Sequence, residues 1–268
     1  MARRSLANTR VLITGASSGI GRELALAFSR RKSRVLLTAR REQELAAVAA
    51  ECRQIEGVTA EWLAGDVSEP GFRAALVARA GSLWGGLDVL VNNAGISAHG
   101  RFAESDEATL RQILEVNFFA ATELTRLALP LLKQSRQAAI VNMSSIIGHR
   151  GLPLNSEYAA SKFALRGWGE SLLAELAADG VEVLIVSPGT TETEFFDHLI
   201  AKRGKLPWGE STAIPAAAVA EQTLRALERG RHEIFPNWRG RALVAVNRLF
   251  PGLVDRALAK FLAASNNR

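Results

Sequence analysis

The chain has 268 residues, of which 48% are hydrophobic and 22% are charged, values that are ordinary for a water-soluble globular protein. No apolar run reaches the roughly 18 residues that a membrane-spanning helix needs, and the segment from Met1 to Arg10 lacks the apolar core of a secretory signal. The single cysteine, Cys52, excludes an internal disulfide and favours a reducing compartment, so we expect a cytoplasmic protein.

The net charge of +6 comes entirely from the C-terminal end. Residues 229–268 hold eight Lys or Arg and two acidic residues, whereas residues 1–228 hold 25 of each kind. Because the main body is neutral and no nucleic-acid-binding motif accompanies the basic end, we expect no nucleic-acid partner. The four histidines lack metal-ligand spacing and have no cluster of Cys or Asp beside them, so we expect no metal site.

Short apolar segments alternate with helical patterns along most of the chain. Strands are predicted at 10–14, 34–39, 58–64, 87–91, 138–143 and 181–187, with helices between them at 20–31, 41–55, 69–83, 106–134 and 156–179. This alternation predicts an α/β protein with a Rossmann fold, in which helices cover both faces of a doubly wound parallel sheet of about seven strands. Because no linker or repeat interrupts the chain, we expect residues 1–268 to form a single domain.

The alternation loosens after Pro188. Residues 190–214 read as a loop with short helical pieces, and we expect them to form a lid over a substrate, because loops after strands carry specificity on such scaffolds. A helix at about 215–229 and a strand at 232–235 follow. Residues 239–268 then form a basic, amphipathic C-terminal extension that is broken at Pro251-Gly252. Its apolar face could pack on its own domain, on another subunit or on a membrane surface.

The first strand runs into a glycine-rich turn, Thr14-Gly15-Ala16-Ser17-Ser18-Gly19-Ile20-Gly21, and a helix follows. Glycines at such a turn let the backbone approach a pyrophosphate, and the helix N-terminus supplies free N–H groups and the positive end of the helix dipole. A glycine trio alone is a weak signal, but its place between strand and helix favours a dinucleotide site.

Tyr158 and Lys162 are four residues apart on a predicted helix and therefore project from the same face. A fixed ammonium group beside a phenol favours the phenolate and lowers the phenol pKa, so Tyr158 could exchange a proton near neutral pH. Pairs of this kind also occur on many solvated helices, so the other motifs carry the argument.

Together the motifs resemble those of the short-chain dehydrogenase/reductase family, from about Arg10 to Thr193. The resemblance rests on Thr-Gly-x3-Gly-x-Gly, on Asn92-Asn93-Ala94-Gly95, and on Ser145 thirteen residues before Tyr-x3-Lys. It implies that Tyr158 exchanges a proton with the substrate oxygen and that Ser145 orients this oxygen. It also implies that Lys162 holds the nicotinamide ribose and lowers the Tyr158 pKa, and that Asn117 anchors a water chain leading to Lys162.

The second strand ends Thr38-Ala39-Arg40-Arg41, without the acidic residue that hydrogen-bonds the ribose of NAD. We therefore expect Arg40 to bind a 2′-phosphate and favour NADP(H) over NAD(H), although Arg40 and Arg41 could simply begin a solvated helix. With the resemblance, the expected cofactor-binding residues are Gly15, Ser17, Ser18, Gly19, Ile20, Gly21, Arg40, Asp66, Val67, Asn93, Ala94, Gly95, Tyr158, Lys162, Pro188, Gly189, Thr191 and Thr193. Ser18 and Thr191 depart from the family pattern, which has a second basic residue and a valine at these positions.

These features predict an NADP(H)-dependent oxidoreductase that interconverts a carbonyl and a secondary alcohol by hydride transfer. The apolar lid residues favour a lipophilic substrate, although they could instead pack the lid on the domain: Phe195, Phe196, Leu199, Ile200, Leu206 and Trp208. The alternatives are a 3-oxoacyl-thioester reductase and a non-catalytic, NADP-sensing or scaffold protein that docks through its basic tail. The resemblance also suggests a homodimer or homotetramer formed through the helices at 106–134 and 156–179.

Overall fold

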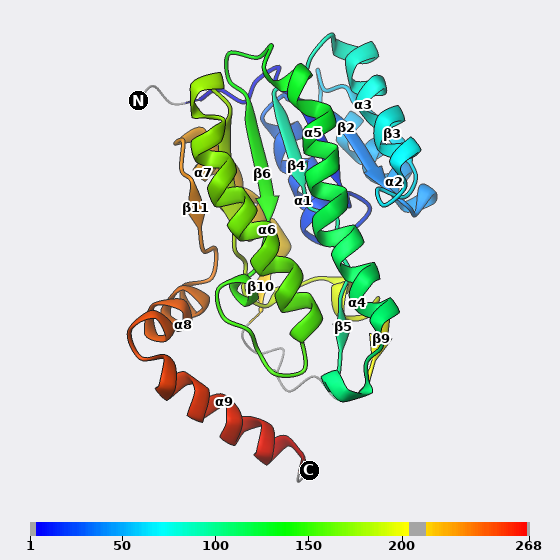
Figure 1. Cartoon of the computed structure of the whole chain (residues 1–268). Coiled ribbons are helices and arrows are strands. Elements are labelled where there is room, and N and C mark those ends of the chain that lie inside the picture. Colours follow the sequence, from blue (N-terminus) through cyan, green and yellow to red (C-terminus); the bar gives the residue numbers. More distant parts are fainter. Residues whose placement is uncertain (1–3, 204–212, 267–268) are drawn as a thin grey trace.

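The computed structural model describes residues 4–203 and 213–266, so Leu206 and Trp208 of the expected lid lie outside the described residues. Its core is a seven-stranded sheet in the order β11-β7-β6-β4-β1-β2-β3, in which all neighbouring strands run parallel (Figure 1). The strands are β1 (Arg10–Thr14), β2 (Arg34–Ala39), β3 (Ala60–Ala64), β4 (Val89–Asn92), β6 (Ala139–Met143), β7 (Glu182–Val186) and β11 (Glu233–Ile234). The predicted fold class is confirmed.

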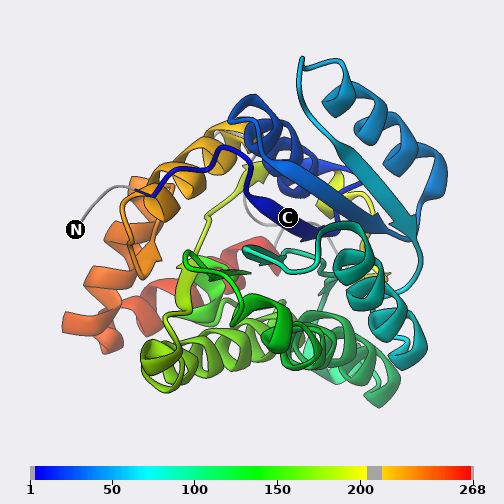
Figure 2. The same ribbon diagram turned by 90° about the horizontal axis from the view of Figure 1, so that it is seen from above.

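Helices cover both faces of the sheet (Figure 2). One face carries α1 (Gly19–Arg30), α2 (Glu42–Arg53) and α7 (Ala216–Glu228), and the other carries α3 (Pro70–Trp84), α5 (Ala120–Leu132) and α6 (Ser156–Glu175). Successive strand residues serve opposite faces, as the two-residue period of a strand requires. In β1, Val11 and Ile13 pack in the first core cluster and Leu12 packs in the second.

The long helix that the sequence predicts at 106–134 is interrupted. It consists of α4 (Glu107–Leu114), a π-helical turn (η2, Glu115–Phe119) and α5. Single π-helical turns inside α-helices occur frequently at functional sites. Here the turn contains Asn117, so the interruption falls at one of the expected site residues.

Two pairs of two-residue strands were not predicted. β5 (Ala98–His99) pairs with β9 (Ala201–Lys202), and β8 (Thr191–Glu192) pairs with β10 (Ile214–Pro215). These segments are too short to show a period in the sequence. The β5–β9 pair holds the chain that follows β7 against the loop that follows β4, whereas the β8–β10 pair joins two segments that both follow β7.

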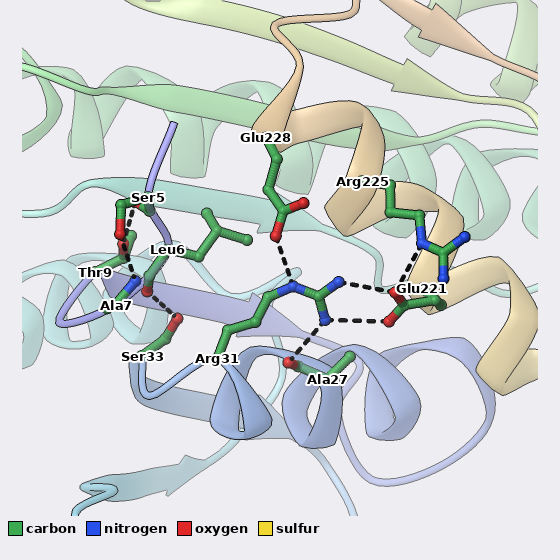
Figure 3. Close-up of polar contacts among 10 residues, drawn as sticks. All are labelled: Ser5, Leu6, Ala7, Thr9, Ala27, Arg31, Ser33, Glu221, Arg225 and Glu228. Carbon is green, nitrogen blue, oxygen red and sulfur yellow. Dashed lines mark hydrogen bonds and ion pairs between the residues drawn. The ribbon is translucent and has the colours of Figure 1, made fainter. Parts of the chain in front are cut away.

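Arg31, directly after α1, connects that helix to α7 (Figure 3). Its guanidinium group donates to both carboxylate oxygens of Glu221, at 2.9 and 3.1 Å, and to Glu228 at 2.8 Å. Glu221 also accepts a hydrogen bond from Arg225, one turn further along α7. Arg31 therefore holds together two helices that are almost 200 residues apart in the chain.

The C-terminal extension forms α8 (Trp238–Leu249) and α9 (Pro251–Asn266), with the break at Phe250 just before the predicted Pro251-Gly252. Figure 1 shows the two helices as an arm beyond the carboxyl ends of the strands. Val244 and Val254 are buried, so each helix buries one apolar side chain. Within 4–203 and 213–266, no helix is long and apolar enough to cross a membrane.

Candidate active site

A cavity of about 850 Å³ opens at the carboxyl ends of the strands, where parallel α/β sheets bind their ligands. Its walls come from the glycine-rich turn, the end of β2, the loops after β3, β4, β6 and β7, and α6. Every residue expected to bind the cofactor lines this cavity, and so does Ser145. Asn117 is the one expected site residue that does not line it.

The glycine-rich turn is pinned to the end of β4. The Asn93 side-chain amide donates to the carbonyls of Thr14, at 2.9 Å, and Gly15, at 3.1 Å, while the Thr14 hydroxyl accepts from the Asn93 and Ala94 N–H groups. Gly15 has φ +65°, and a Cβ on Gly21 would lie 2.1 Å from the Gly15 carbonyl oxygen. Only glycine permits this approach, which leaves the start of α1 open to a phosphate.

The part of the cavity at the end of β2 carries two arginines. Arg40 is exposed and lines the cavity. The neighbouring Arg41, which the sequence did not assign to the site, reaches the Ser17 hydroxyl at 3.4 Å and the Glu194 carboxylate at 3.2 Å. Its sequence position gave no sign of these partners, because Glu194 is 153 residues away. The arrangement places two guanidinium groups where an acidic residue would select NAD.

Asp66 and Thr193 each form a local turn at the cavity wall. The Asp66 carboxylate accepts from the Ser68 N–H at 2.9 Å and from the Ser68 hydroxyl at 2.7 Å. The N-cap of α3 is Glu69, so Asp66 does not cap this helix. The Thr193 hydroxyl accepts from the Phe195 N–H and begins the short helix η5 (Glu194–Phe196).

Ser145, Tyr158 and Lys162 meet on one side of the cavity. Ser145 follows β6, and α6 presents Tyr158 and Lys162 one turn apart. Burial raises the pKa of Tyr158 to about 12, and a hydrogen bond with the Ser145 side chain opposes this shift. The Ser145 hydroxyl also accepts from the Ile147 N–H at 3.2 Å, which fixes its position.

The expected lowering of the Tyr158 pKa by Lys162 is wrong for this structure. The Lys162 ammonium group lies 5.6 Å from the centre of the Tyr158 ring and donates to the Met143 carbonyl at 2.8 Å. Burial lowers the pKa of Lys162 to about 8. Desolvation of both side chains therefore decides the direction of both pKa shifts. The sequence could not predict this, because the spacing shows the neighbouring charge but not the burial of the two groups.

Asn117 is fully buried behind the cavity wall. Its side-chain amide donates to the Ile96 carbonyl and the Ser161 hydroxyl, both at 2.9 Å, and its side-chain oxygen accepts from the Ile96 N–H at 2.8 Å. A Cβ on Gly95 would lie 3.3 Å from this oxygen and 3.5 Å from the Lys162 ammonium nitrogen. The lack of a side chain at Gly95 thus leaves space between Asn117 and Lys162.

Apolar side chains line the cavity together with Ser145 and Tyr158, and so do the polar Asn155, Asp197 and His198. The apolar ones, most of which the sequence did not assign to the site, are Ile146, Ile147, Leu152, Phe195, Leu199, Ile200, Leu243 and Leu258. Leu243 and Leu258 belong to α8 and α9. Their helical spacing predicted an apolar face but not where that face would pack. No group of three or more metal-binding side chains gathers anywhere in the described part of the chain.

Comparisons with known proteins identify the family of this chain. The family model described as short chain dehydrogenase matches residues 9–204. The Hydroxysteroid 11-beta-dehydrogenase 1-like protein B of Xenopus laevis is 34% identical over 270 residues, covering 99% of this chain and 91% of its own. Ketoacyl reductase HetN of Nostoc sp. is 33% identical over 261 residues, covering 94% of this chain and 88% of its own.

Solved structures are also similar over nearly their whole length. A short chain dehydrogenase/reductase from Burkholderia phymatum in complex with NAD has a TM-score of 0.84 and 25% identity, covering 93% of this chain and 96% of its own. A short-chain dehydrogenase from Sphingobium yanoikuyae in complex with NADPH has a TM-score of 0.78 and 30% identity, covering 92% and 95%. The chain therefore belongs to the short-chain dehydrogenase/reductase family of oxidoreductases.

Proposed function

We propose that the protein is an NADP(H)-dependent oxidoreductase that interconverts a carbonyl and a secondary alcohol on a lipophilic substrate. The observation that carries the proposal is the shared cavity: Ser145, Tyr158 and Lys162 lie in the same space as the glycine-rich turn and Arg40. Proton exchange and dinucleotide binding can therefore occur side by side, as hydride transfer requires.

The residues present fit a nicotinamide dinucleotide. The glycine-rich turn and the N-terminus of α1 would hold its pyrophosphate, and Thr193 would hydrogen-bond its carboxamide. Similar structures have been solved with NAD and with NADPH, which supports this class of cofactor. Arg40 and Arg41 favour the 2′-phosphate of NADP(H), since a guanidinium group pairs bidentately with phosphate.

The bound cofactor would supply the hydride, and the chain's own residues would manage the proton. Reduction of a carbonyl leaves negative charge on its oxygen, and Tyr158 would donate a proton there while Ser145 hydrogen-bonds the same oxygen. Lys162 would hold the nicotinamide ribose. Asn117 would anchor a water in the space beside Gly95 and connect Lys162 to solvent, since its side-chain oxygen retains a lone pair there.

The part of the cavity beside Ser145 and Tyr158, here called the substrate half, favours an uncharged, apolar molecule. Aliphatic and aromatic side chains line the cavity together with Ser145 and Tyr158, and the Phe195 ring centre lies 5.7 Å from that of Tyr158. The likeness to a hydroxysteroid dehydrogenase-like protein supports the same class. The likeness to a ketoacyl reductase supports the alternative of a 3-oxoacyl-thioester reductase. A comparison of kcat/KM for simple apolar ketones and for an acetoacetyl thioester separates the two.

Two contacts with partners belong to the same proposal. Phe119, Leu127 and Phe163 are exposed on the helical layer of α5 and α6, which favours a homodimer or homotetramer through these helices. Exposed Trp238, Leu249, Phe250 and Leu253 alternate with arginines on the C-terminal arm, which favours peripheral contact with a membrane surface. Light scattering and sedimentation with anionic or neutral vesicles test these contacts.

The lone, buried Cys52 is in keeping with a reducing cytoplasm.

Replacement of Tyr158 by Phe tests the proposed reaction. The variant removes one hydroxyl and should reduce turnover of an apolar ketone about 10²- to 10⁴-fold, the usual contribution of a general acid. NADPH affinity should stay within a few fold, which serves as the control for folding. Full turnover by Tyr158→Phe would rule out this mechanism. Binding of NADPH without reduction of any ketone by the wild type would instead favour a non-catalytic, NADP-sensing or scaffold protein.

A further inference from the structure

The C-terminal extension contributes directly to the substrate half of the cavity. Leu243 of α8 and Leu258 of α9 are half-buried and line the same space as Ser145 and Tyr158. Val254, one turn before Leu258, is buried. One face of α9 therefore looks toward the site, while Leu253, next to Val254 in the chain, remains exposed on another face.

Arg150 attaches both helices of the extension to the loop that carries the catalytic serine. It lies five residues after Ser145, and its side chain is only 20% exposed. Its guanidinium group donates to the Asn247 side chain in α8 at 3.0 Å and pairs with the Asp255 carboxylate in α9. One side chain thus sets the position of α8 and α9 together.

Close packing against the loops after β6 and β7 strengthens this attachment. A Cβ on Gly240 of α8 would lie 2.6 Å from the Ile146 side chain, and Ile146 follows Ser145 directly. The Ile146 N–H donates to the Pro188 carbonyl at 2.9 Å. On the other side, the Asn237 side chain lies 3.3 Å from the position of a Cβ on Gly189. The extension and the residue that caps α8 therefore pack against the loops after β6 and β7, which carry Ser145 and Gly189.

We infer that the C-terminal extension is the wall that limits the length of the substrate's apolar body, with Leu258 as its specificity-determining contact and Arg150 as its positioning residue. This inference rests on the proposed function and names a finer substrate class. The substrate is an uncharged ketone or secondary alcohol with an extended hydrocarbon body that runs from Ser145 toward α9. Leu258 meets this body by van der Waals contact, so its size sets how many carbons fit.

A series of straight-chain methyl ketones of increasing length tests the wall, with kcat and KM measured for each at saturating NADPH. Leu258→Ala should move the preferred length upward and raise kcat/KM for longer members about tenfold, since methylenes in an apolar pocket discriminate by roughly this factor or more. Leu258→Trp should move the preference to shorter ketones. Lys260→Ala, an exposed change on the same helix, is the matched control and should keep the wild-type profile.

Arg150 has its own test. Arg150→Met should raise KM for long ketones at least about tenfold while kcat and NADPH affinity change less than threefold, because the wall moves and the proton-donating groups stay. Arg150→Lys should recover part of the loss, since it keeps the charge facing Asp255 but not the second contact to Asn247. A general loss of folding would lower kcat and NADPH binding together and would contradict the positioning role.

If kcat/KM depended on ketone length in the same way in the wild type and in both Leu258 variants, the inference would be overturned while the proposed reductase function would stand. If the wild type reduces no ketone, the proposed function fails instead. Binding of unreactive fatty amides of increasing length, followed by NADPH fluorescence, then measures the same profile without turnover. A binding profile that Leu258→Ala leaves unchanged would also overturn the inference.

Discussion

Replacement of Lys162 by Met should change how the stability of the protein depends on pH. Lys162 is buried, and its ammonium group donates a hydrogen bond to the Met143 carbonyl. Burial lowers its pKa from 10.5 to about 8. The unfolded chain therefore binds more protons than the folded protein between these two values. Stability must rise with pH through this window, because the cost of burying the charged amine disappears as the amine loses its proton.

The size of this effect follows from the two pKa values. At pH 7 the burial of Lys162 costs about 3 kcal/mol, and at about pH 9.5 it costs about 1 kcal/mol. The wild type should thus gain about 2 kcal/mol between these pH values relative to Lys162→Met, which has no amine to titrate. Loss of the hydrogen bond to Met143 contributes equally at both pH values and cancels in the comparison.

Urea unfolding at both pH values, with the two proteins at equal concentration and without cofactor, measures the difference. Tyr158 is present in both proteins, with a pKa of about 12 when folded against an ordinary value of 10.0, so its titration cancels in the comparison. Parallel stability changes in the wild type and Lys162→Met would show that Lys162 keeps an ordinary pKa, and would refute the reasoning that burial controls this side chain.

Three further substitutions test the cofactor site and the fold. Arg40→Ala should weaken NADPH binding at least about tenfold and leave NADH binding within about twofold, as followed by cofactor fluorescence, since a charged hydrogen bond contributes about 1.5–3 kcal/mol; equal losses for both cofactors would contradict the proposed 2′-phosphate contact. Gly21→Ala places a Cβ against the Gly15 carbonyl and should destabilise the protein by at least about 1–3 kcal/mol in urea unfolding, whereas Gly71→Ala, where a Cβ meets open space, should not. Arg31→Ala should lower stability by about 1–2 kcal/mol by removing the guanidinium group that Glu221 and Glu228 share, and an unchanged urea midpoint would argue against the α1–α7 attachment.

The parts of the site that depend on local spacing could be predicted from the sequence. Tyr158 and Lys162 share a helix face because the helix period places them there, and the glycine-rich turn opens α1 because it joins a strand to a helix. The order of these segments also predicts a parallel sheet whose carboxyl ends converge. The expected cofactor-binding residues all line one cavity, although the prediction used no information on side-chain packing.

The parts that depend on long-range packing could not be predicted. The pairing of Arg41 with Glu194 joins two segments with no shared pattern, and the π-helical turn at Asn117 leaves no mark in the helical period. The predicted direction of the Tyr158 pKa shift was wrong, because the sequence spacing reveals the neighbouring charge but not the burial that raises the pKa. The amphipathic pattern of the C-terminal extension likewise could not distinguish a cavity wall from a subunit or membrane contact.

The fate of the transferred hydride tests the central proposal most directly. NADPH that carries deuterium at the hydride-donating carbon is incubated with an apolar ketone and the enzyme, and the alcohol product is examined by mass spectrometry and NMR. The proposed reaction predicts one deuterium on the former carbonyl carbon with the wild type and little or no labelled alcohol with Tyr158→Phe. An unlabelled alcohol, or equal labelling by Tyr158→Phe, would contradict hydride transfer with Tyr158 as the proton donor.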